Sequence, residues 1–365
     1  MRSRAGIEAM LAESIRVQPA AGDRSVRARQ VLVLLSLMLG AVSIASMTVG
    51  ASGVALFPAL GRALSGEALA LQERVVLLDI RLPRLLTGIL VGAALAVSGA
   101  VMQGLFRNPL ADPGIVGVGA GAGLGAVLAI VLGAMLPASL AAITGPHLVP
   151  IAAFLGGWGS TLVLYRVSTR QGRTSVATML LAGIAMGALA GALTGLMVYI
   201  ADDQQLRDLT FWGLGSLAGA SWTKIAASAP IILLALIAAP ALARALNAFT
   251  LGEAAAAHLG IPVQRMKNIA ILTVAGATGA AVAISGGIGF IGIVVPHLLR
   301  LAMGPDHRYL LPAAALLGAT LLLGADMIAR VIVAPAELPI GIVTAVLGAP
   351  VFLWILLKRR GLVDM

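Results

Sequence analysis

An acidic residue and an arginine lie four residues apart inside a strongly apolar segment near the C-terminal end of the chain. These are Asp326 and Arg330. Four-residue spacing places both side chains on one face of a helix, where they can form an ion pair. An ionisable group at membrane depth is a functional candidate. A paired acid near the end of a helix also has a purely structural interpretation, and the sequence leaves both open.

Groups that perform catalytic chemistry are otherwise sparse. The chain has no cysteine and only 4 histidines, which are scattered, so thiolate nucleophiles, disulfides and a clustered metal site are not expected. The phosphate-binding pattern G-x-x-x-x-G-K-[ST] does not occur, and ATP therefore cannot bind here by the P-loop mechanism. These features predict a chain that is not an enzyme and binds neither a metal nor a cofactor itself.

Glycines recur at four-residue spacing within two apolar segments. One series is Gly183, Gly187, Gly191 and Gly195, and the other is Gly117, Gly121 and Gly125. This spacing places each series on one helix face and allows a neighbouring backbone to approach closely. The face can serve tight helix packing, or it can form a wall with few side chains past which a bulky ligand slides. We expect the first series to line a translocation pathway.

The elements that carry these residues are membrane helices. Hydrophobic residues make up 59% of the 365 residues and charged residues 11%, against about 25% charged residues in a typical soluble domain. A membrane-spanning helix needs about 20 largely apolar residues. We therefore predict an all-α integral membrane protein with about ten spans: 31–57, 85–106, 114–134, 148–165, 176–200, 225–243, 268–284, 289–303, 310–329 and 339–357.

The net charge of +10 reflects membrane topology rather than a nucleic-acid partner. Most lysines and arginines fall in segments that share a side with the N-terminus, so the positive-inside rule places both termini in the cytoplasm. Residues 1–30 are polar and rich in arginine, which predicts a cytoplasmic tail followed by a ten-span permease domain over 31–365. Membrane lipids surround that domain.

Residues 246–267 form the longest connection expected on the cytoplasmic side. Thr250 to Glu253 can cap a short helix that runs through the following alanines and ends at Gly260. Such a helix is either an interfacial connector or a docking lever for a motor subunit.

Arg81, Arg84 and Arg330 are the cations nearest to span ends on the outer side. They can extend to lipid headgroups, or they can form an electrostatic dock for an acidic partner. The sequence leaves the two interpretations open.

Several ordered motifs resemble one family from about residue 75 onward. They are Arg81-Leu-Pro-Arg-Leu-Leu, Arg107-Asn-Pro-Leu-Ala-Asp-Pro-Gly114, Leu251-Gly-Glu, Gly289-Phe-Ile-Gly-Ile-Val-Val-Pro-His and Glu337-Leu-Pro-Ile-Gly. In these motifs the chain resembles the permease subunits of type II ABC importers for iron-siderophores, heme and cobalamin. Its overall pattern is most similar to the heme importer permeases.

The resemblance implies an assembly in the bacterial inner membrane. Two copies of the permease would form the pore, and two ATPase subunits carrying ATP and magnesium would dock on 246–267. A periplasmic binding protein would present acidic residues to Arg81, Arg84 and Arg330. The positions that match the family's ATPase-coupling motif are Gly252, Glu253, Ala254 and Ala255.

The same resemblance implies a cytoplasmic gate. The matching positions are Asn108 and Leu110 after the second span, and Val176 and Ala177 before the fifth. The second pair lacks the hydroxyl groups of the cobalamin relative. Heme is the expected cargo, with ferric siderophore and cobalamin as alternatives. An ion-coupled secondary transporter should carry several unpaired acids in its spans, whereas Asp326 is the only clear one in the predicted spans.

Overall fold

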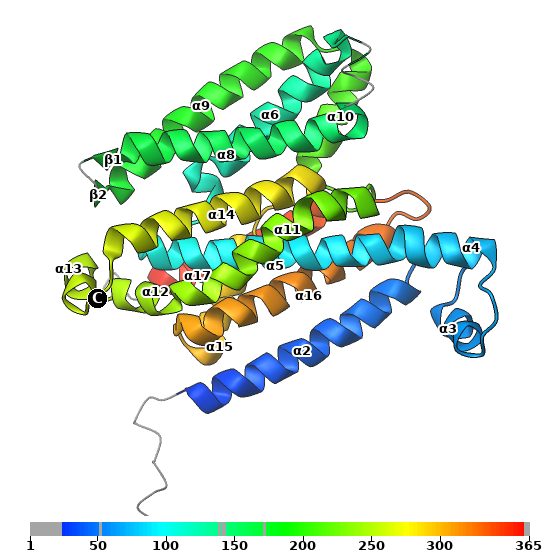
Figure 1. Cartoon of the computed structure of the whole chain (residues 1–365), viewed down its shortest axis with the longest axis horizontal. Coiled ribbons are helices and arrows are strands. Elements are labelled where there is room, and N and C mark those ends of the chain that lie inside the picture. The colour runs from blue at the N-terminus through cyan, green and yellow to red at the C-terminus, as the bar shows by residue number, and fades with distance from the viewer. Residues whose placement is uncertain (1–23, 51–52, 138, 140–143, 171–172, 361–365) are drawn as a thin grey trace, which may run out of the picture.

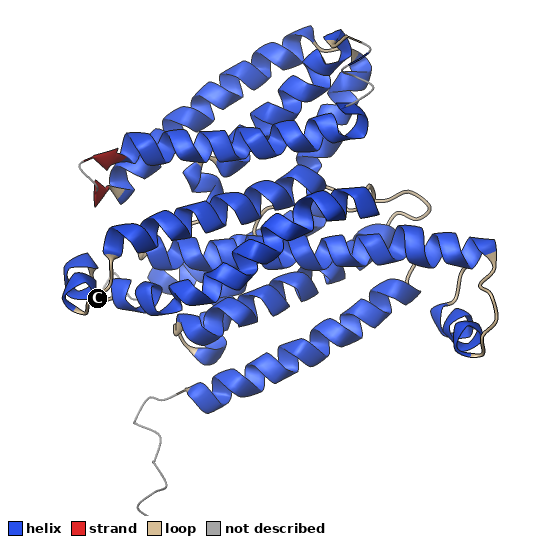
Figure 2. Ribbon diagram, in the orientation of Figure 1, coloured by secondary structure: helices blue, strands red, loops and turns tan. Residues whose placement is uncertain are grey.

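A computed structural model describes residues 24–50, 53–137, 139, 144–170 and 173–360. The described chain is a bundle of helices whose long members run side by side (Figure 1), and one two-residue strand pair lies at one end of it (Figure 2). The predicted all-α class is confirmed.

Eight segments are long and apolar enough to cross a membrane in the described part of the chain, and two shorter apolar helices accompany them, Ile291–Met303 (α15) and Ile340–Trp354 within α17 (Ile340–Arg360). The prediction of about ten spans is confirmed. The helices of the eight longer segments are α2 (Ser25–Thr48), α5 (Leu82–Phe106), α6 (Val118–Leu132), α8 (Leu148–Ser168), α9 (Val176–Ile200), α11 (Trp222–Ala238), α14 (Val263–Ser285) and α16 (His307–Val331).

Short elements connect these spans. On the outer side lie α3 (Leu56–Leu64), α4 (Leu71–Arg74), the π-helix η1 (Val75–Arg81), the 3₁₀-helices η3 (Gly133–Met135) and η4 (Gly145–His147), and α10 (Asp203–Leu214). Towards the opposite end lie η2 (Pro113–Val116), η5 (Ala239–Leu242), α12 (Ala243–Phe249) and α13 (Glu253–His258). A hairpin of β1 (Thr169–Arg170) and β2 (Arg173–Thr174) joins α8 to α9.

The first span differs from its predicted bounds of 31–57. Helix α2 begins at Ser25 and ends at Thr48, and the apolar residues after it belong to the separate helix α3. The boundary at Thr48 coincides with Val49 in an extended conformation and Gly50 at a φ of +151°. The apolar run continued past this backbone break, which composition could not detect.

The expected break after the seventh span is confirmed. Helix α14 ends at Ser285, and Gly286 follows at a φ of +70°, a left-handed conformation that favours glycine. Helix α15 then starts at Ile291.

Helix α5 is the centre of the bundle. In the most apolar 18-residue stretch of the span that contains α5, 83% of the residues are buried. The helix lies between α14 and α16 in Figure 1. Helices α6, α8 and α9 lie on one side of this centre and α2 on the other. In the corresponding stretch of the predicted pathway helix α9, 6% of the residues are buried, so few α9 side chains are enclosed within the single chain.

Candidate functional site

The two glycine series have different surroundings. A Cβ atom added at Gly121 or Gly125 of α6 would collide with the backbone of α8 at Gly156 and Ala152. The packing interpretation is therefore confirmed for Gly121 and Gly125. Gly117 precedes α6 at a φ of +74°, and a Cβ atom there would meet the side chains of Leu164 and Ser160.

The series on α9 does not pack in this way. A Cβ atom at Gly187, Gly191 or Gly195 would meet nothing within 4 Å. Gly183 is half-buried, and Gly191 and Gly195 are exposed. Tight packing within the chain is therefore the wrong interpretation for Gly187, Gly191 and Gly195, while their role in a pathway stays a prediction.

A buried cluster of charges lies at the outer end of α5 and α16. The Arg84 guanidinium donates to both Asp326 oxygens, with Nη2 at 2.9 Å from Oδ1, and its Nη1 lies 2.8 Å from Oε1 of Glu337. Nε of Arg330 lies 3.1 Å from Oδ2 of Asp326. The predicted pairing of Asp326 with Arg330 is confirmed, and Asp326 is 1% exposed. Arg84 and Glu337 were not expected in this cluster.

Two arginines hold the C-terminal end of α2. Nη1 of Arg81 donates to the Met47 carbonyl at 2.6 Å, and Arg330 donates to the carbonyls of Ser46 and Val49. The last carbonyls of a helix have no partner within the helix and carry its negative dipole end. The two guanidinium groups supply hydrogen-bond donors for these carbonyls and positive charge at the negative end of the dipole. These contacts fix α2 to the bundle.

This geometry bears on the predicted dock for a binding protein. Arg81, Arg84 and Arg330 are 5%, 7% and 8% exposed, and each donates to acceptors inside the chain. The headgroup interpretation is therefore wrong, because the side chains point into the protein. Docking of a binding protein through these three residues stays a prediction. In this structure their side chains bind acceptors within the chain.

The cytoplasmic connection contains the expected short helix, α13, which begins at Glu253. Its cap differs from the expectation: the Thr250 hydroxyl donates to the Asn247 carbonyl at 2.6 Å instead of capping α13. The helix starts from Gly252 at a φ of +101° with no side-chain cap. Glycine adopts this left-handed backbone without strain. Ala254 is exposed and Ala255 half-buried.

The two predicted gate segments lie at the ends of helices α5 and α9. Arg107 ends α5 in the left-handed region, and Oδ1 of Asn108 accepts from the Leu110 amide at 3.0 Å, which forms a local turn typical of asparagine. Ala177 lies exposed in the first turn of α9. The Val176 side chain lies outside the described residues, so the second gate pair is described only in part.

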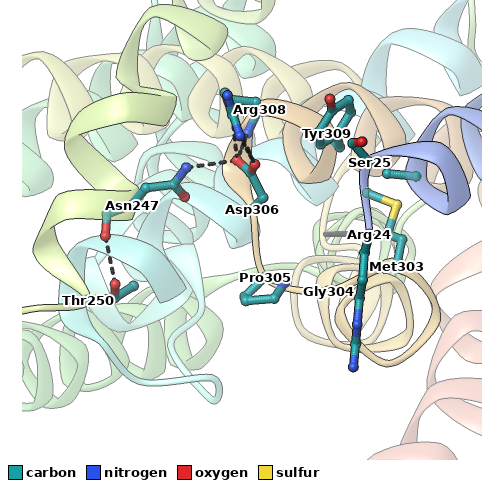
Figure 3. Close-up of a pocket in the computed structure, with 11 residues that line it drawn as sticks. Arg24, Ser25, Asn247, Thr250, Met303, Gly304, Pro305, Asp306, Arg308 and Tyr309 are labelled. Carbon is teal, nitrogen blue, oxygen red and sulfur yellow. Dashed lines mark hydrogen bonds and ion pairs between the residues drawn. The ribbon is translucent and has the colours of Figure 1, made fainter. Parts of the chain in front are cut away.

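A cleft of about 560 Å³ opens at the same end of the bundle, between the start of α2, α12 and the loop that connects α15 to α16. Figure 3 shows the Asp306 carboxylate facing Arg308 and the Asn247 amide. Burial alone would raise the pKa of Asp306, but hydrogen bonds from Arg308 and Asn247 outweigh it and lower the pKa to about 2. Asp306 therefore stays ionised and holds α12 to α16.

Sequence reasoning missed a polar stripe at the start of α14. Gln264, Lys267 and Asn268 follow the helical i, i+3, i+4 spacing, and all three make hydrogen bonds to elements outside α14. Lys267 was predicted to lie in the connection 246–267, whereas it lies in α14, which already begins at Val263. The spacing was the signal that could have found this stripe. Among the described residues, no group of three or more His, Asp or Glu residues could hold a metal ion.

Several known permeases are similar in sequence to this chain. The hemin transport system permease protein HmuU of Yersinia pestis is 46% identical over 335 residues, which cover 92% of this chain and 97% of HmuU. The cobalamin import permease BtuC of Halobacterium salinarum is 41% identical over 79% of this chain and 74% of its own length. The vitamin B12 import permease BtuC of Escherichia coli O9:H4 is 43% identical over 77% and 83%.

A solved structure supports the same relationship. An inward-facing metal-chelate type ABC transporter superposes with a TM-score of 0.79 at 33% identity, over 90% of this chain and 99% of that one. The sequence profile of the FecCD transport family matches residues 30–358. With ten apolar helices in the described bundle, this chain belongs to the FecCD transport family and is a multi-pass inner-membrane permease of the type II ABC importers.

Proposed function

We propose that this permease imports heme, which it receives from a periplasmic binding protein and delivers to the cytoplasm by alternating access. The observation that carries the proposal is the 46% identity to a hemin permease over nearly the whole of both chains. The cobalamin permeases, at 41% to 43% identity, support cobalamin as the first alternative. Ferric siderophore is the second, and an ion-coupled secondary transporter is the alternative from a different class.

The open face of α9 supports a pathway for a bulky cargo. At Gly187, Gly191 and Gly195 an added Cβ atom would meet nothing within 4 Å, so another molecule can approach the backbone of α9 closely at these positions. In a homodimer, two such faces would enclose a smooth conduit with few ligating groups. Such a conduit would bind its cargo weakly and leave the affinity to the binding protein. ATP binding would then shift the population between outward-open and inward-open states.

The cytoplasmic end would receive the driving force. Two separate ATPase subunits, which bind ATP and magnesium, would dock on 246–267 through the start of α13. The gate would be formed by Asn108 and Leu110 with Val176 and Ala177. The docking of the binding protein at Arg81, Arg84 and Arg330 belongs to the same proposal, and it requires these buried groups to become accessible.

The cargo can be tested in the reconstituted complex of permease, ATPase and binding protein. Proteoliposomes are supplied with ATP inside and with hemin, ferric siderophore or cyanocobalamin outside, each at the same concentration. We expect ATP-dependent uptake of hemin above the other two. Uptake of cobalamin without uptake of hemin would replace heme by the first alternative.

The chain by itself should neither hydrolyse ATP nor import hemin, because its sequence contains no P-loop. The measurement is phosphate release and hemin accumulation by liposomes that contain the chain alone, with the full complex as positive control. Hemin uptake by the lone chain under a proton or sodium gradient would contradict the ABC mechanism and favour the secondary transporter.

Replacing Gly191 with phenylalanine should block uptake without unfolding the protein. Gly191 is exposed and its Cβ position is open, so the ring has space in the single chain but would project into the proposed conduit. We expect loss of most hemin uptake with an unchanged unfolding temperature. Leu189→Phe is the control, because Leu189 is 56% exposed and lies about 200° around the helix from Gly191. Equal hemin uptake by both variants would contradict the prediction that the α9 glycines line the translocation pathway.

A further inference from the structure

A network of polar side chains joins three elements at the cytoplasmic end of the bundle. Nε2 of Gln264 donates to the Thr174 hydroxyl and to Oδ1 of Asn268, each at 2.8 Å. The Tyr165 hydroxyl donates to the same Asn268 oxygen at 2.5 Å. The network thus ties α8 and the hairpin β1–β2 to the first two turns of α14.

Lys267 extends this network to α13. Its Nζ lies 2.7 Å from Oε1 of Glu253, the first residue of α13, and donates to the Thr174 carbonyl of β2 at 3.2 Å. The Lys267 side chain is only 5% exposed. A buried ammonium group is costly unless it is paired and hydrogen-bonded, so both partners are needed to keep it in place.

The carbonyl that Lys267 holds lies directly before the predicted pathway helix. Thr174 is followed by Ser175, whose hydroxyl caps α9 by accepting from the Thr178 amide at 3.3 Å. The Ser175 amide also donates to the Ser168 carbonyl at 2.9 Å. The last residue of the hairpin is therefore fixed from both sides, and a displacement of Thr174 must move the start of α9.

We propose that Lys267 is a positioning residue that couples α13 to the cytoplasmic end of α9. When α13 moves, the Glu253–Lys267–Thr174 link carries the hairpin and the gate residues Val176 and Ala177 with it. The inference rests on the proposed function, because it assumes that α13 receives the ATPase motion. It adds a residue outside the coupling motif of Gly252, Glu253, Ala254 and Ala255, and a route from that motif to the gate.

The absence of cysteine from the chain allows a direct test in the full complex. Leu181→Cys places a thiol on an exposed position in the second turn of α9, where Leu181 is 69% exposed. Leu301→Cys places one on α15, where Leu301 is 53% exposed. The rate of thiol labelling is measured with and without ATP. With Lys267 present, we expect ATP to change the rate at position 181 more than at position 301.

Two variants of Lys267 decide the outcome. Lys267→Met keeps the apolar stem and removes the ammonium group, so we expect the ATP-dependent change at position 181 to be lost. The number of hemin molecules imported per ATP hydrolysed should also fall. Lys267→Arg keeps the charge and should retain the ATP-dependent change. Should Lys267→Met fail to assemble, Glu253→Gln breaks the same link at a side chain that is 43% exposed.

The proposal is overturned if labelling at position 181 still responds to ATP in both Lys267→Met and Glu253→Gln with the yield per ATP unchanged. It is also overturned if position 181 shows no ATP response with Lys267 present. Failure of the proposed function appears differently. In that case the unsubstituted complex imports no hemin, whether or not it hydrolyses ATP.

Discussion

Replacing Asp326 with alanine should destabilise the folded permease by about 3–5 kcal/mol, the range for breaking a buried ion pair by removing one partner. The substitution leaves two guanidinium groups in a buried site, and only one of them, Arg84, retains another carboxylate, that of Glu337. An uncompensated charge is costly where water is excluded. The measurement is chemical unfolding of the purified permease in lipid nanodiscs.

The double variant Asp326→Leu with Arg330→Met is the matched control. It removes one negative and one positive charge while keeping apolar bulk, and Arg84 keeps its pair with Glu337. We expect it to recover part of the stability lost in Asp326→Ala, since it also removes the hydrogen bonds from Arg330 to the Ser46 and Val49 carbonyls. The ion pair between Arg62 and Glu73 offers a comparison, because the Arg62 side chain is 43% exposed. Replacing Arg62 with alanine should lower the free energy of unfolding by only about 0.2–1 kcal/mol. Equal losses for Arg62→Ala and Asp326→Ala would contradict the importance of burial.

The same double variant separates folding from docking. Reversing Arg84 or Arg330 to glutamate would disrupt the buried cluster before it could report on a binding protein. In Asp326→Leu with Arg330→Met, the fold is expected to persist without the Arg330 charge. A weaker affinity for the binding protein in this stable variant, with reduced sensitivity to salt, would support the docking prediction. An unchanged affinity would exclude Arg330 from the dock.

Composition and spacing were sufficient to predict the spans because burial in lipid requires long uncharged helices. The break between the spans 268–284 and 289–303 was predictable for a different reason. Glycines such as Gly286 favour a turn within an otherwise uninterrupted apolar run. The end of α2 was not predictable. It depends on Arg81 and Arg330, which are far from Thr48 in the sequence and hold the last carbonyls of the helix.

The two glycine series have the same spacing, and only the folded structure shows that their surroundings differ. Gly121 and Gly191 belong to series with the same four-residue spacing, yet the first contacts the α8 backbone and the second meets open space. The difference arises from the position of each helix in the bundle, which spacing does not encode. Asp326 and Arg330 could be paired from local spacing, whereas the long-range partners Arg84 and Glu337 could not.

Replacing Gly99 with alanine should be among the most damaging single-methyl changes in the chain. Gly99 lies on α5, and a Cβ atom there would collide with the carbonyl oxygen, carbonyl carbon and Cα of Gly292 on α15. All three contacts are backbone atoms, so no side-chain rotation can relieve them. The helices would have to separate in the most buried part of the bundle, and closely packed interiors resist such a shift.

We expect Gly99→Ala to cost about 3 kcal/mol, the upper end of the usual range for overpacking, together with loss of most hemin uptake. Gly195→Ala is the matched control, because its Cβ position on α9 has nothing within 4 Å. Alanine favours helix over glycine by about 1 kcal/mol, so this variant should be as stable as the parent or slightly more stable. Thermal unfolding of both in nanodiscs checks the difference. If the two variants unfold at the same temperature, the close approach of α5 and α15 does not determine the packing of the bundle.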